Sequence, residues 1–197
     1  QLYFAVPYNS SVGNYQVTFF NRQVLADAGY DDETLYKLQA DGEWTWDKFR
    51  EIAAAATDMD KGIYGTAFGQ TIENFVYSND AAFFEKTEYN GTIIEQFAGN
   101  KPNAVAAWQF LLDMAAEGTG NTELYQGDNY LSAAFFRGEL AMMCTWAARA
   151  ADQDTMGLDY GILYIPKGPQ ADDYTSAVIE YNPFGVYKGH ANPEPPI

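Results

Sequence analysis

The stretch WTWDKFREIAAAATDMDKGIYGTAF, residues 44–68, carries the pattern of a helix, a turn and a strand in direct succession. Thr45 is a favourable helix N-cap, and the apolar residues after it recur every three or four positions, so that they share one helix face. Residues 58–62 have the composition of a turn. The alternation that follows predicts a short strand ended by Gly69. Helices alternating with strands favour an α/β fold.

The same criteria predict further strands and helices on both sides of this stretch. Strands are expected at residues 2–6, 15–20, 63–68, 140–144, 160–165, 174–180 and 184–187. Helices are expected at residues 22–28, 33–38, 46–56, 71–85, 102–117, 130–137 and 147–153. Residues 88–100 are expected to form a loose polar loop. Trp46 and Trp108 are assigned to the core, and the buried stripe of the helix after Pro102 is expected to contain Val105, Trp108, Leu111, Leu112 and Ala115.

The composition is that of a folded, strongly acidic protein. Of 197 residues, 47% are hydrophobic and 19% are charged, with 27 Asp and Glu against 11 Lys and Arg. This excess gives a formal net charge of -16, which repels phosphate backbones at long range. We therefore do not expect nucleic acid as a partner. We also expect the protein to be a monomer.

Common catalytic templates are missing from the sequence. The one histidine, His190, lies in a tail rich in Gly and Pro, and Cys144 lies in an apolar run where a buried, inert thiol is expected. No nucleophile elbow, phosphate loop or paired-cysteine motif occurs, so neither a cofactor nor a metal is expected. An enzyme remains as the alternative: a glycoside hydrolase with two carboxylates, drawn from Glu73, Asp80 and Glu180.

Aromatic residues are abundant, with 15 Tyr, 13 Phe and 4 Trp, and several lie near turns or strand ends. Aromatic rings present apolar faces on which the C–H patches of sugars stack, while amides and carboxylates bond the hydroxyls. Most aromatic residues of any domain belong to its core. The composition is thus compatible with a carbohydrate ligand without requiring one.

Five short motifs, in order and with consistent spacing, carry a family resemblance. They are FFNRQVL at 19–25, WTWDKF at 44–49, DKGIYG at 60–65, FRGELAM at 136–142 and YIPKGP at 164–169. Together they resemble family 1 of the extracellular solute-binding proteins, the sugar-capturing components of bacterial ABC importers. One departure is Lys48, where the family often has Glu, which would complete a capping box.

This resemblance implies a particular fold and role. Family members have two α/β lobes joined by crossing strands, and the lobes close around the solute. Residues 1–197 resemble the C-terminal lobe, with crossover segments near 1–20 and 174–188 and the first lobe largely absent. The implied fold is a periplasmic-binding-protein-like lobe of type II, with a mixed sheet flanked by helices. The implied partners are a saccharide and a membrane permease. The implied location of the protein is the periplasm or the outside of the cell, with a membrane anchor upstream of Gln1.

The resemblance also implies a set of ligand-binding positions near strand ends. A stacking role is expected for Trp146 and Phe75, and a hydrogen-bonding role for Asn14, Glu73, Asn74 and Asn182. The full predicted set consists of Asn14, Tyr15, Glu73, Asn74, Phe75, Tyr77, Trp146, Tyr181 and Asn182.

Overall fold

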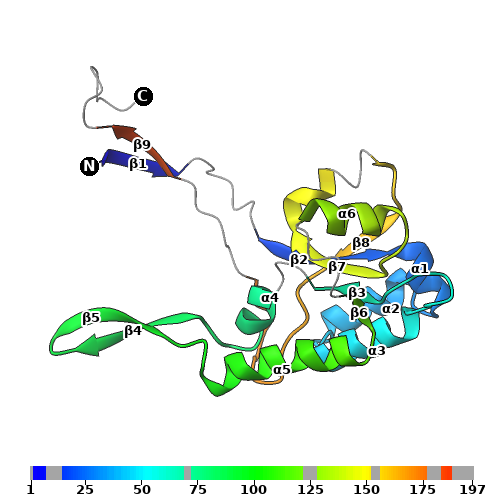
Figure 1. The fold of residues 1–197 in the computed structure, drawn as a ribbon, viewed down its shortest axis with the longest axis horizontal. Helices are drawn as coiled ribbons and strands as arrows, with labels where there is room; N and C mark the ends of the chain where they lie inside the picture. Colours follow the sequence, from blue (N-terminus) through cyan, green and yellow to red (C-terminus); the bar gives the residue numbers. More distant parts are fainter. Residues whose placement is uncertain are drawn as a thin grey trace.

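The structure is a computed structural model, and it describes residues 2–7, 15–68, 72–121, 128–151, 156–176 and 183–187. Most of these residues form one lobe, in which helices pack on a mixed sheet (Figure 1). Two further strands, β1 (Leu2–Pro7) and β9 (Pro183–Tyr187), pair with each other in antiparallel orientation. These two strands confirm the predictions for both ends of the chain.

The sheet of the lobe is built around strand β2 (Gln16–Asn21). It pairs in antiparallel orientation with β7 (Met142–Trp146) on one side and with β8 (Tyr160–Leu163) on the other. Two short strands, β3 (Thr66–Ala67) and β6 (Gly120–Asn121), form a parallel pair. Residues 64–65, just before β3, hydrogen-bond to residues 139–142 beside β7, so that the two groups of strands adjoin. The predicted mixed sheet is therefore present.

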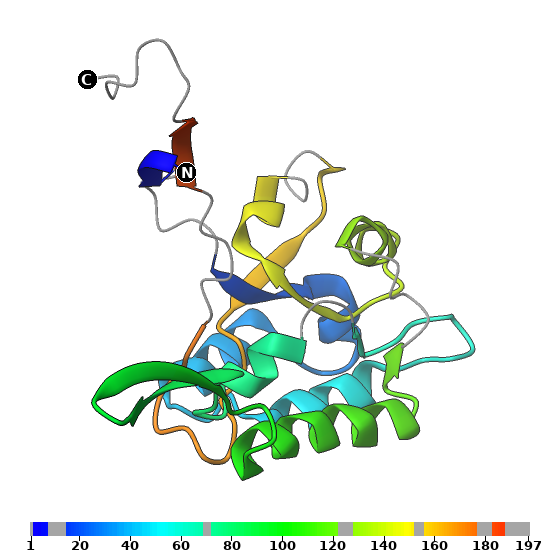
Figure 2. The ribbon, with the colours of Figure 1, turned by 60° about the vertical axis from the view of Figure 1, so that its left-hand side comes forward.

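Helices cover both faces of this sheet (Figure 2). The first face packs against α1 (Arg22–Asp27), α2 (Asp32–Ala40), α3 (Trp46–Ala56), α4 (Ile72–Tyr77) and α5 (Pro102–Ala116). The second packs against α6 (Asp128–Phe136). Successive side chains of β2 point to opposite faces of the sheet, so Phe20 belongs to the core on the first face and Phe19 to the core on the second.

Helix ends follow the local signals in the sequence. The Thr45 hydroxyl accepts a hydrogen bond from the backbone N–H of Lys48 at the start of α3, which confirms the predicted cap. Gly29 has a φ of +92° after α1, a conformation that glycine adopts without a Cβ penalty. The cap of α3 does not need a Glu at position 48, because the backbone N–H of Thr45 already donates to the carbonyl of Glu43.

Cys144 is buried in β7, as expected, and its sulfur lies 3.4 Å from the Thr18 hydroxyl oxygen. Burial raises the pKa of the thiol to about 12, because desolvation disfavours the thiolate. Since the thiolate is the nucleophilic form, Cys144 is an inert core residue in this fold.

The prediction for residues 71–100 was partly wrong. The expected helix is limited to α4, and the expected loop contains a hairpin of β4 (Phe84–Tyr89) and β5 (Thr92–Phe97) that projects from the lobe (Figure 1). Its turn, Asn90-Gly91, has positive φ at both residues. This dipeptide is the preferred two-residue hairpin turn, because its twist matches that of the flanking strands.

The predicted buried stripe of α5 was also wrong in part. Helix α5 buries Phe110, and the ring of Phe110 stacks on Trp46 with 4.8 Å between centroids. This contact turns the expected core residue Trp108 outward, where 38% of it is exposed. Only Leu111 of the predicted stripe is fully buried, and the buried residues of α5 are Ala104, Ala107, Phe110, Leu111 and Met114.

Two predictions near the C-terminal end need a correction. The helix expected at 147–153 begins as the short 3₁₀ helix η1 (Ala147–Arg149), and residues 152–155 lie outside the described residues. Residues 174–176, expected to begin a strand, lack strand structure; the side-chain hydroxyls of Tyr174 and Ser176 donate to the carbonyls of Gln39 and Gln16. The rest of that predicted strand lies outside the described residues.

Candidate functional site

Sheet topology brings three distant segments to one edge of the sheet. Residues 64–67 and β7 run parallel, so both end at the same edge. Strand β2 is antiparallel to β7 and therefore begins there. This edge thus carries Tyr15 and Gln16 before and in β2, Trp146 at the end of β7, and Phe68 directly after β3. In α/β sheets, ligands bind outside the carboxyl ends of strands.

The corner between β2 and β7 has a defined geometry. Gln16 lies directly opposite Trp146 in the antiparallel ladder, and the backbone N–H of Ala147 donates to the Tyr15 carbonyl over 3.0 Å. Directly opposite residues point to the same face and have neighbouring side chains. Trp146 is half-buried, and 42% of Tyr15 is exposed. Aromatic surface is therefore accessible at this corner.

Helix α4 contributes three more of the predicted residues. Glu73 is half-buried, and desolvation raises the pKa of its carboxyl above the usual range. Asn74 is 1% exposed, and among the described residues neither its Oδ1 nor its Nδ2 has a hydrogen-bond partner. Tyr77 is half-buried, with its ring edge-on to Phe83.

Phe75 does not offer the stacking surface that the sequence predicts. It is 1% exposed, and its ring lies within 6 Å of the rings of Trp46, Phe49 and Phe110. This aromatic cluster covers the ring, so Phe75 is a core residue in this structure. Trp46, by contrast, confirms its assignment to the core.

The other predicted positions, Asn14, Tyr181 and Asn182, lie outside the described residues, as do His190 and Glu180. Asp80, a carboxylate of the hydrolase alternative, is exposed just after α4 with a φ of +51°. The described part of the predicted site therefore consists of Tyr15, Glu73, Asn74, Tyr77 and Trp146.

Gln16 belongs to this edge, although the sequence analysis did not select it. It is 2% exposed, and its side-chain Oε1 has no hydrogen-bond partner among the described residues. Alternation concealed this residue: Gln16 and Thr18 alternate with the apolar Val17 and Phe19, a pattern that predicts a solvent-facing side, whereas all six residues of β2 are buried. A long amide at a core-facing strand position is uncommon without a polar partner.

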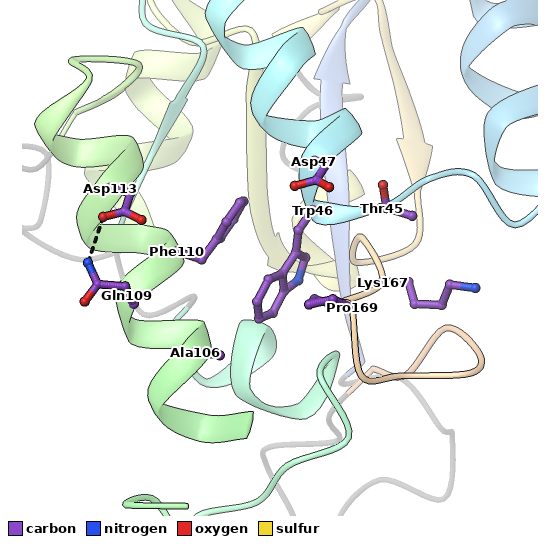
Figure 3. Close-up of a pocket in the computed structure, with 9 residues that line it drawn as sticks. All are labelled: Thr45, Trp46, Asp47, Ala106, Gln109, Phe110, Asp113, Lys167 and Pro169. Carbon is purple, nitrogen blue, oxygen red and sulfur yellow. Dashed lines mark hydrogen bonds between the residues drawn. The ribbon is translucent and has the colours of Figure 1, made fainter. Parts of the chain in front are cut away.

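A separate pocket of about 370 Å³ lies between the start of α3, helix α5 and the loop at 166–169 (Figure 3). The Trp46 ring lies between Phe110 and Pro169, while the Lys167 side chain extends away from the pocket. Gln109 donates a hydrogen bond to Asp113 on the same helix. Residues Thr45, Trp46, Asp47, Ala106, Gln109, Phe110, Asp113, Lys167 and Pro169 line it. None of the predicted site residues is among them.

Two further findings, on metal-binding groups and on membrane-spanning helices, apply to the described ranges of the chain. Across these residues, no group of three His, Cys, Asp or Glu side chains is arranged to hold a metal ion. Likewise, none of the helices described has both the length and the apolar character needed to cross a bilayer.

Two solved structures have a similar fold. The GacH receptor of Streptomyces glaucescens, solved unliganded and with acarbose, matches with a TM-score of 0.67 and 22% identity over 96% of this chain and 45% of its own. An ABC transporter solute-binding protein from Thermotoga lettingae, bound to α-D-tagatose, matches with a TM-score of 0.63 and 18% identity over 88% of this chain and 43% of its own.

These likenesses establish the fold of a type II periplasmic-binding-protein-like lobe. The chain spans less than half the length of either matched protein. A search of curated protein sequences gives no match. The family model for bacterial extracellular solute-binding proteins matches residues 3–195, nearly the whole chain. The chain therefore belongs to the family of bacterial extracellular solute-binding proteins.

Proposed function

We propose that this protein captures a solute reversibly, without chemical change, and delivers it to the permease of an ABC importer. The family assignment supports this function over the glycoside hydrolase alternative. The observation that carries the proposal is the sheet edge itself, where the partly exposed Trp146 lies beside the buried carboxamide of Gln16. An apolar surface with a few fixed polar groups is the usual composition of a small-molecule site.

The proposed solute is a sugar or an oligosaccharide. An indole face suits the C–H patches of a pyranose, and amide groups suit its hydroxyls. Both matched structures are compatible with this class, since one was solved with acarbose and the other with α-D-tagatose. In this proposal Trp146 stacks on the sugar, while Tyr15, Glu73, Asn74 and Tyr77 bond to its polar groups. Asn14, Tyr181 and Asn182 remain proposed contacts.

The rest of the proposal concerns the whole protein. The described lobe would be the C-terminal one, and a second lobe would close over the sheet edge on ligand binding. The pairing of β1 with β9, which lie side by side in Figure 1, supports a double connection between lobes. The family's description implies a periplasmic or extracellular location. We propose a monomer anchored to the membrane through a segment upstream of Gln1.

A thermal-shift screen of the full-length protein tests the capture function. A ligand that binds only the folded state raises the melting temperature, so neutral mono- and oligosaccharides are expected to stabilise the protein. Trp146→Ala should weaken the best saccharide at least tenfold, whereas Trp108→Ala, which removes an exposed tryptophan from α5, should leave the affinity unchanged. Turnover of chromogenic glycosides, or equal effects of the two variants, would contradict the proposal.

A further inference from the structure

Two buried carboxamides, Gln16 in β2 and Asn74 in α4, have unsatisfied hydrogen-bonding atoms. Gln16 Oε1, Asn74 Oδ1 and Asn74 Nδ2 have no partner among the described residues, although both residues are at least 98% buried. More than nine in ten buried polar groups in proteins are hydrogen-bonded, because an unpaired one costs about 1–3 kcal/mol. The unpaired Gln16 oxygen lies beside the partly exposed Trp146, which indicates that a bound molecule supplies the missing partner.

Both amides are on the same side of the sheet. Along β2, residues 16, 18 and 20 face the first core, and Phe20 belongs to that core together with Phe75 and Val76 of α4. Helix α4 carries Asn74, so the helix and the Gln16 side chain are on one face. Trp146 faces the same way, since it lies directly opposite Gln16 in the ladder. The indole and one of the two amides are therefore immediate neighbours.

The main chain of Gln16 needs no further partner. Its N–H donates to the Ser176 Oγ over 3.0 Å, and the Ser176 hydroxyl donates to its carbonyl over 2.6 Å. One step further along the same face, the Thr18 hydroxyl is also satisfied, because it donates to the Tyr164 carbonyl over 3.1 Å. Within Gln16, the unsatisfied atom is therefore the side-chain Oε1, at the start of β2.

The unsatisfied atoms are two acceptors and one donor, and this combination restricts the ligand. A hydroxyl group both donates and accepts, so sugar hydroxyls can satisfy all three atoms. A carboxylate only accepts: it could bond Asn74 Nδ2, but it would face the oxygens of Gln16 and Asn74 with its own negative charge. An acceptor-rich site therefore disfavours acidic ligands.

The charges of the proposed site also disfavour acidic ligands. Its described residues, 15–16, 73–77 and 146, include a carboxylate, Glu73, and no Lys or Arg. Arg149 lies nearby in sequence on η1, and it already takes part in another interaction. A carboxylated ligand would thus lose its hydration next to Glu73 without gaining an established cationic partner.

We infer that Gln16 recognises the ligand, accepting a hydrogen bond from a solute hydroxyl beside the Trp146 stacking surface, and that the site selects uncharged sugars over their carboxylated analogues. This inference rests on the proposed function, since it specifies the residue and the sugar class of the same site. Sites built to bond a hydroxyl discriminate strongly against analogues that lack it.

The variant Gln16→Met tests the role of the residue, because methionine has a similar length and no amide. Affinity for the best neutral saccharide should fall about fivefold to tenfold, measured by titration calorimetry. The melting temperature without ligand should stay the same or rise, since the change removes an unpaired buried acceptor. If Gln16→Met folds poorly, Gln16→Leu gives the same comparison.

The matched control is Thr18→Val, two residues along the same strand face. It removes a satisfied hydrogen bond, so it should lower the melting temperature and leave the affinity within twofold. A structural role for Gln16 would give this same pattern. A Gln16→Met variant with reduced stability and unchanged affinity would therefore overturn the inference.

Ligand class is tested with matched sugars on the wild-type protein: glucose against glucuronate, galactose against galacturonate, and their neutral and acidic trimers. The neutral member of a bound pair should bind at least tenfold more tightly. Tighter binding of the acidic member would overturn the inference and leave the proposed function intact. If no saccharide binds, the proposed function fails, and the inference fails with it.

Discussion

The indole N–H of Trp46 donates a hydrogen bond to the Ser78 hydroxyl over 3.1 Å, and both groups are buried. Trp46 is the first residue of α3, and Ser78 directly follows the last residue of α4. The backbone N–H of Gly168 donates to the Ser78 carbonyl over 2.8 Å, so the loop after β8 joins the same contact. Helix α3, helix α4 and the loop after β8 thus meet at Ser78.

The first prediction concerns this contact. Ser78→Ala leaves the Trp46 N–H buried without its acceptor, so the free energy of unfolding should fall by about 1–3 kcal/mol. Urea denaturation of the purified protein measures the change. In a double-mutant cycle with Trp46→Phe, the two effects should be less than additive, because the second change removes the donor. Strict additivity would show that the two groups do not interact.

Glu73 provides a prediction about pH. Desolvation raises the pKa of its carboxyl in the folded state, so between the unfolded and folded pKa values the folded protein binds more protons. Its contribution to stability is therefore lost as the pH rises through that range. Glu73→Gln should raise the melting temperature at pH 7, and the gain should shrink as the pH falls towards 4. A gain independent of pH would exclude desolvation as its cause.

Cys144 should be unreactive in the folded protein. With a thiol pKa of about 12, the reactive thiolate is scarce at pH 8, and the buried sulfur excludes reagent. Ellman's reagent should therefore modify the thiol only after guanidinium is added. Folding stability should also fall as the pH rises above about 8.5, where the unfolded thiol ionises first. Cys144→Ala should remove that part of the pH dependence.

The hairpin of β4 and β5 should respond locally to changes in its turn. Gly91 has a φ of +76°, so Gly91→Val strains the turn and should destabilise the hairpin by about 1 kcal/mol or more. Most hairpin side chains are exposed, so the melting temperature of the lobe should change little. Hydrogen exchange should show faster exchange at residues 84–97 alone. Faster exchange throughout the sheet would contradict this independence.

Local signals in the sequence predicted much of the fold. Thr45 caps α3 and Gly29 follows α1 because capping depends on a few neighbouring residues. The hairpin was missed although Asn90-Gly91 is a strong turn signal, since the polar residues around it resemble a loop. Trp108 was misplaced for another reason: its orientation depends on the stacking of Phe110 on Trp46, a contact between helices that no local pattern contains.

The candidate site depended still more on tertiary structure. Trp146 and Asn74 were selected from the family resemblance, but only the strand directions show that Trp146 lies at the edge where β2 begins. The resemblance also selected Phe75, whose neighbours in the aromatic cluster come from α3 and α5. Gln16 was missed because its alternation with Val17 and Phe19 predicts a solvent-facing side chain, and only the packing of helices on both faces of the sheet buries it.

The double hydrogen bond between Ser176 and the main chain of Gln16 also has a mechanical consequence. Ser176 lies on the chain between β8 and β9, so tension applied through that segment reaches Gln16, the first residue of β2, through these two bonds. The force would arrive directly opposite Trp146, at the end of the β2–β7 ladder. The segment that leads from β8 to β9 is therefore mechanically coupled to the recognition corner.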